Sequence, residues 1–127
     1  MSLDGLKSTF KKCIKMHMNG EDAHGYTCAN GIHMDCKPED VRRLYDGVLI
    51  AEMSGQTTMD IRDYHNVVHT NIPVSEVRLM VKELGERIAA RLRHKWMLHQ
   101  KIDAATTTAE VESIVWDERT APFSRFR

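Results

Sequence analysis

The residues best suited to chemistry are two histidines and two cysteines that stand close together, because these side chains are the usual ligands of zinc. They are His24, Cys28, His33 and Cys36, within a stretch of thirteen residues. Structural zinc sites usually take paired ligands from one knuckle of the chain. Here Cys28 and His33 fall on opposite arms of a predicted hairpin, and strand alternation points His33 and Cys36 to opposite faces. We expect no bound metal and keep a small metal-binding module on these four residues as an alternative.

Two further histidine pairs have spacings that do not bring the rings together. His65 and His69 are four residues apart, which is about 13 Å along a straight strand. His94 and His99 are five residues apart on a predicted helix, roughly 140° out of phase. We expect neither pair to hold an ion.

A carboxylate that orients a histidine is a common acid–base device, and Asp60, Asp63 and His65 offer its components. Polar residues at turns and strand ends have the same composition without any catalytic role. The sequence contains no Gly-x-Ser-x-Gly elbow, no Gly-x-Gly-x-x-Gly fingerprint and no Walker-type loop. We therefore expect a protein that is not an enzyme and needs no cofactor.

The composition is that of one ordinary globular domain. The chain has 127 residues, 42% of them hydrophobic, and its 18 basic and 18 acidic residues leave a formal net charge of zero. This balance argues against binding of nucleic acid or of an anionic membrane through the net charge of the chain. No apolar run reaches the roughly 18–20 residues of a membrane-spanning helix. The chain has three cysteines, whereas a secreted disulfide scaffold usually has more of them and an even number. This count indicates a reducing compartment.

Periodicity and turn residues predict an α+β fold in the order ββ-α-ββ-α-α, with two hairpins that form a mostly antiparallel sheet. The first hairpin turns at Asn30-Gly31, which is typical of a type I′ turn. A helix follows from Pro38 to about Met53, and the second hairpin turns at residues 63–66. Thr107 and Glu110 form a predicted capping box. It starts a last short helix that is expected to run to Trp116.

The remaining segments are less regular. Residues 6–18 fit either a helix or a strand, and we favour the strand. We expect residues 1–24 to form an N-terminal segment with an extra strand or helix, residues 25–116 to form a single domain, and residues 117–127 to form a tail.

The longest predicted element is a helix with one apolar stripe. Its stripe residues are Val74, Val77, Val81, Leu84, Ile88, Leu92, Trp96, His99 and Ile102. A helix of this length measures about 43 Å, whereas a domain of this size is roughly 30 Å across. We expect the helix either to break near Gly85 or to project and use its stripe on a partner.

The first part of this stripe follows a seven-residue repeat, and basic residues border the stripe further on. We therefore expect a protein–protein interaction surface here, for self-association. Its residues are Val74, Val77, Val81, Leu84, Ile88, Arg91 and Lys95. Arg87, Arg91 and Lys95 also step by four along one side, which leaves a nucleic-acid-binding accessory protein as a second alternative. Long basic side chains that cover an apolar border have the same pattern.

Several segments resemble a small uncharacterised domain of tailed bacteriophages and prophages, which is found in or beside tail-fibre genes. The resemblance covers residues 25–116 and runs through these segments in order: Gly31–Asp35, Thr58–Thr70, Val81–Gly85, Lys95-Trp96, Ile102–Thr107 and Ala109–Trp116. It implies a non-catalytic structural or assembly role in a tail fibre, with protein partners and no membrane. It also implies a location in the virion tail or in the host cytoplasm.

Overall fold

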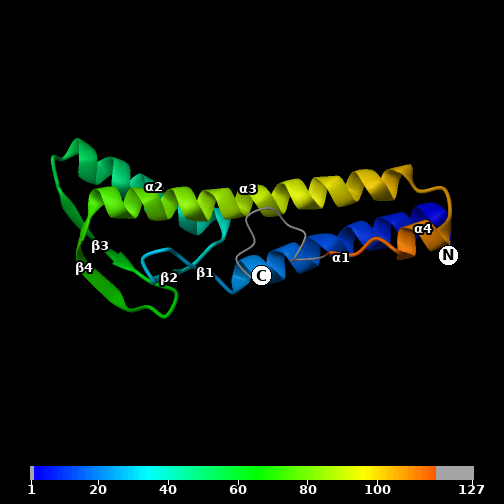
Figure 1. Ribbon diagram of the computed structural model, residues 1–127, viewed down its shortest axis with the longest axis horizontal. Helices are drawn as coiled ribbons and strands as arrows, with labels where there is room; N and C mark the ends of the chain where they lie inside the picture. The colour runs from blue at the N-terminus through cyan, green and yellow to red at the C-terminus, as the bar shows by residue number, and fades with distance from the viewer. Residues whose placement is uncertain (1, 117–127) are drawn as a thin grey trace. The chain divides into compact units, whose positions relative to one another are not determined.

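The computed structural model describes residues 2–116, and its described part contains four helices and two hairpins (Figure 1). The elements are α1 (Leu3–Ala23), β1 (Tyr26–Thr27), β2 (His33–Met34), α2 (Pro38–Met53), β3 (Thr58–Arg62), β4 (Val68–Pro73), α3 (Val74–Ala104) and α4 (Thr108–Glu112). The predicted α+β class is confirmed, as is the order of elements from β1 to α4.

The chain divides into two compact units, which we describe separately. Of the described residues, unit 1 holds 2–21 and 89–116, and unit 2 holds 22–88. Helix α3 contributes residues to both units. The segment before residue 22 therefore shares a unit with the end of α3, and the expected tail at 117–127 lies outside the described residues.

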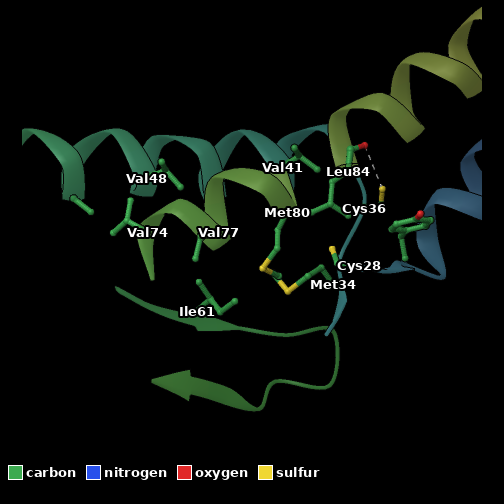
Figure 2. Close-up of a cluster of buried hydrophobic side chains, with 12 residues drawn as sticks. Cys28, Met34, Cys36, Val41, Val48, Ile61, Val74, Val77, Met80 and Leu84 are labelled. Carbon is green, nitrogen blue, oxygen red and sulfur yellow. Dashed lines mark hydrogen bonds between the residues drawn. The ribbon is translucent and has the colours of Figure 1, made fainter. Parts of the chain in front are cut away.

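Unit 2 is built around one apolar core to which both hairpins, α2 and α3 contribute (Figure 2). Leu84 and Val77 of α3 and Val48 of α2 are fully buried there. Ile61 of β3 points into the same space from below the helices in that view. Burial of this apolar surface is the main stabilising contribution to the unit.

The first hairpin pairs Tyr26 with Met34, and the hydrogen bond between Cys28 and Ile32 leaves a three-residue loop. The Cys28 carbonyl accepts from Gly31 N at 2.9 Å, and Cys28 N donates to the Ile32 carbonyl at 2.9 Å. Gly31 has φ +88°, whereas Asn30 is not among the described residues with positive φ. The predicted type I′ turn is therefore wrong, because a type I turn followed by a left-handed glycine needs positive φ at the glycine alone.

The two hairpins do not share a sheet. In the described chain they form separate two-stranded antiparallel sheets, β1-β2 and β3-β4. The second hairpin carries a bulge between Met59 and Ile61, where Asn71 has φ +56°. The backbone N–H of Tyr64 donates to the His33 carbonyl at 2.9 Å and so links the hairpins at one end. The single sheet expected from the sequence is replaced by this contact.

Helix α2 begins and ends as predicted. Pro38 occupies its first turn, where a missing N–H leaves no hydrogen bond unmade. At its end, Gln56 N donates to the Ala51 carbonyl and Gly55 N to the Glu52 carbonyl, which is a Schellman motif.

In unit 1, the N-terminal segment is a helix, so the favoured strand is wrong. Phe10 and Ile14 lie on one face of α1 and pack with Leu98 and Ile102 of α3, whereas Cys13 is exposed. The strand pattern and the helix pattern were both present in the sequence. The apolar partner on α3 selects the helix, because a helix places residues four apart on one face.

Helix α3 passes through Gly85 without a break and ends at Ala104. In its second half the buried positions are Ala90, Arg91, His94, Leu98 and Ile102, while Trp96 is 54% exposed. The apolar stripe predicted there is therefore wrong at Trp96. Thr107 caps α4 by accepting from Glu110 N at 3.2 Å, as expected, although α4 ends at Glu112.

We expect Gly25→Ala to destabilise unit 2 by about 2 kcal/mol or more. Gly25 has φ +74°, and a Cβ there would lie 2.6 Å from the Met34 carbonyl oxygen and 2.8 Å from His33 Nε2. Urea unfolding followed by circular dichroism measures the loss.

The matched control is Gly85→Ala in α3. A Cβ at Gly85 meets nothing within 4 Å, and alanine favours a helix interior over glycine by up to about 1 kcal/mol. We expect this variant to unfold at a higher urea concentration. Equal effects of the two substitutions would contradict the geometry described here.

Candidate functional site

Three of the four side chains considered as zinc ligands, those of Cys28, His33 and Cys36, have other contacts in unit 2. His33 uses both ring nitrogens: Nδ1 lies 2.8 Å from Thr27 Oγ1, and Nε2 lies 2.8 Å from the His24 carbonyl oxygen. The buried thiol of Cys36 donates to the Leu84 carbonyl at 3.8 Å (Figure 2). Cys28 is buried in the apolar core of unit 2.

The chemistry of Cys36 also differs from that of a metal ligand. Burial, with a further contribution from the charge of Asp22, raises the pKa of the Cys36 thiol to about 12. The thiol is therefore protonated at neutral pH, whereas zinc binds the thiolate. Within residues 2–116, no three histidine, cysteine, aspartate or glutamate side chains form a group that could hold a metal ion.

Asp63 organises the turn of the second hairpin. Its Oδ1 accepts from the backbone N–H of His65 at 2.8 Å and of Val67 at 3.0 Å, and its Oδ2 lies 2.9 Å from His69 Nε2. The hydrogen bond to His69, and then the one to Val67, lower the pKa of Asp63 below its ordinary value of 3.8. The carboxylate thus closes the turn.

This arrangement differs from the predicted acid–base cluster. Asp63 contacts the backbone of His65, and its side-chain partner is His69. Asp60 accepts from Asn71 N at 3.0 Å in the bulge. The pair Asp63–His69 was not predicted from the sequence, although Asp63 begins the predicted turn and His69 lies in the strand that returns from it.

Aromatic rings join the two hairpins of unit 2. The His33 ring lies edge-on to Tyr64, with centroids 4.9 Å apart, and is stacked on His65 at 5.9 Å. The Tyr64 hydroxyl donates to the Ala23 carbonyl at 3.3 Å. These contacts fix the hairpins to each other, and they occupy the ring that the sequence offered as a ligand.

The predicted self-association seam is core in unit 2. Val74, Val77 and Leu84 are buried, and Val81 and Ile88 pack against them from partly buried positions. A folded unit 2 therefore leaves no room for a partner helix on these three buried side chains. The heptad spacing was correct, but it describes packing on the hairpins and α2 of the same chain.

The basic residues of α3 are placed by partners in their own units. The Arg87 guanidinium lies 4.7 Å from the centre of the Tyr26 ring in unit 2. In unit 1, Arg91 is 2% exposed and forms an ion pair with Glu21, while Lys95 is partly buried. Two of the three residues of the predicted nucleic-acid stripe are therefore inaccessible to phosphates.

A polar cluster in unit 1 surrounds Glu21. The indole N–H of Trp116 donates to Glu21 Oε1 at 2.8 Å, and the buried His94 ring lies 4.5 Å from the Trp116 ring. The cluster ties α1, α3 and the residues after α4 together.

Large apolar side chains remain at the surface of unit 2. On α2, Ile50 is 64% exposed and Met53 is 86% exposed, one helical turn apart. Val67 and Val68 are more than half exposed at the end of the second hairpin. The exposure of Ile50 and Met53 was not predicted from the sequence, from which only the bounds of this helix were expected.

Comparisons with protein-family models, with curated proteins and with solved structures each found no match to this chain. The described residues contain no helix that is both long enough and apolar enough to span a membrane.

We expect Asp63→Asn to unfold at a lower urea concentration at pH 7. Because the pKa of Asp63 is lowered in the folded protein, its carboxylate stabilises the fold at pH values above its ordinary pKa of 3.8. This contribution is lost as the pH falls through the lowered pKa. The native protein should therefore lose more stability than Asp63→Asn between pH 5 and a pH well below 3.8. Asp46→Asn, an exposed aspartate on α2, is the control and should follow the native curve.

We also expect one fast-reacting thiol. Cys13 is exposed, whereas Cys28 and Cys36 are buried and the Cys36 pKa is near 12. Titration with a chromogenic disulfide reagent at pH 8 should modify about one thiol per chain quickly. The other two should react after denaturation, and three fast thiols in the folded protein would be inconsistent with this core.

Proposed function

We propose that this protein is a non-catalytic, tail-associated structural or assembly protein that acts through protein–protein contacts, including self-association. The observation that carries the proposal is the exposed apolar surface of unit 2, formed by Ile50 and Met53 on α2. Exposed apolar groups close together are typical of surfaces that a partner covers.

The state of the polar side chains supports a role without catalysis. His33 has both ring nitrogens in hydrogen-bonding contacts, and Asp63 uses both carboxylate oxygens to close a turn. The Cys36 thiol is protonated and buried. A general base or a nucleophile needs a reactive atom directed at a substrate, and these atoms are directed at neighbouring parts of the fold.

The proposed setting is the virion tail or the host cytoplasm during tail assembly. It rests on the sequence resemblance over residues 25–116, whose segments include Thr58–Thr70 and Ala109–Trp116. The partner on this proposal is a second copy of the chain or a tail-fibre protein.

We expect the protein to self-associate at tens of micromolar in sedimentation velocity. The double substitution Ile50→Glu with Met53→Glu should shift the association at least tenfold toward monomer. Two carboxylates would then have to leave water when the surface is covered.

Leu79→Glu is the matched control, because Leu79 is 62% exposed but lies on α3. We expect it to associate like the native chain. A native protein that stays monomeric at these concentrations would remove self-association from the proposal, and an effect of Leu79→Glu equal to that of the α2 variant would remove the role of α2.

A further inference from the structure

Unit 2 contains a pocket of about 290 Å³ between α2 and the second hairpin. One wall is α2, from Asp40 to Gly47, and the opposite wall is β3, from Met59 to Arg62. Met34 and Asp35 close one end. The pocket adjoins the exposed apolar surface, because Arg43, Gly47 and Ile50 stand at helical spacing on one face of α2.

The pocket combines an apolar floor with a charged rim. Met34 and Ile61 are buried in the floor, and Leu44 and Met59 are partly buried beside them. Gly47 leaves space in the α2 wall, since a Cβ there would lie 3.4 Å from Met59 Cε. Three aspartates and two arginines form the rim: Asp35, Asp40, Asp60, Arg43 and Arg62.

The backbone of β3 also borders this pocket. In the described chain β3 has one strand neighbour, β4, with Ile61 opposite His69. Asp63 N donates toward β4, to the Val67 carbonyl, whereas Tyr64 N donates away from β4 to His33. Alternation along a strand therefore turns the backbone groups of Arg62 to the same side as those of Tyr64. An extended chain could pair with such an edge.

The charge of unit 2 indicates which kind of peptide would fit this pocket. Residues 22–88 carry seven basic and eleven acidic side chains, a net charge of −4, and the rest of the sequence carries +4. Residues 119–127, beyond the described part, read Arg-Thr-Ala-Pro-Phe-Ser-Arg-Phe-Arg. They hold three arginines, two phenylalanines and no acidic residue, which suits an apolar floor with aspartates on its rim.

We propose that the pocket binds residues 119–127 of a second copy of this chain, with a phenylalanine on the apolar floor and arginines against Asp35 and Asp60. The proposal rests on the proposed function and names its contact surface. Because the two contacting surfaces differ, the association is head-to-tail and produces rings or open chains.

The test is a titration of the full-length protein into a fluorescein-labelled peptide of residues 119–127, with binding measured by fluorescence anisotropy. We expect saturable binding, and excess unlabelled peptide should shift the protein toward monomer in sedimentation. A peptide with Phe123→Ala and Phe126→Ala should bind at least about tenfold more weakly, because aromatic burial contributes most of the affinity.

Two pocket variants and one control variant locate the binding. Asp35→Lys reverses a charge on the rim at an exposed position and should weaken peptide binding about tenfold, while Asp46→Lys on α2, outside the pocket lining, should not. Gly47→Leu fills the α2 wall and should also weaken binding, with circular dichroism as the check on folding.

The absence of saturable binding, or equal binding by Asp35→Lys and Asp46→Lys, would overturn this inference. Self-association that persists in Asp35→Lys would do the same while it leaves the proposed function standing. A native chain that binds the peptide but stays monomeric would overturn the proposal that a second copy is the occupant.

Discussion

The burial of one face of α3 along its 31 residues is the constraint on which the rest of this structure depends. A helix of this length cannot be covered by a single small core, since its two ends are about 45 Å apart. Two sets of elements therefore cover different parts of this face. The hairpins and α2 cover Val77 and Leu84, while α1 covers Leu98 and Ile102.

The same constraint explains where the charged residues of α3 lie. Arg87 and Arg91 stand at positions that continue the buried face, so each needs a partner that offsets the loss of water. The Tyr26 ring accommodates the first, and Glu21 pairs with the second. Arginine suits such sites because its planar group can stack on a ring or pair with a carboxylate.

In unit 2, polar side chains likewise serve as partners for groups within the fold. The hairpins are too short to form a wide sheet, so side chains hydrogen-bond to backbone groups that have no partner in a strand ladder. Asp63 satisfies two backbone N–H groups in one turn, and His33 connects β1 to the chain before it. Residue types that often perform catalysis stabilise turns here, and the exposed apolar side chains of α2 are where we propose that another polypeptide binds.

The sequence by itself determined the local elements, because their signals are local. Pro38 at a helix start, Thr107 as the N-cap of the last helix and turn residues between alternating strands act within a few residues, and the structure has each of them. The Glu110 carboxylate accepts from the hydroxyls of Thr106 and Thr107, whereas a capping box would have it reach the Thr107 backbone N–H. The α+β class follows from their order. The spacing from Val74 to Ile88 also marked one apolar helical face, although from it we expected a surface for self-association.

Only the tertiary structure decided what each face packs against. Residues 6–18 fitted two periods, and contact with Leu98 and Ile102 selected the helix. The seam at Val77 and Leu84 looked like a surface for a partner until the hairpins and α2 of the same chain covered it. The Asp63–His69 pair and the pocket beside β3 join residues on different strands and helices. Periodicity along a chain states which side chains are apolar, whereas the neighbour that buries them depends on contacts between distant segments.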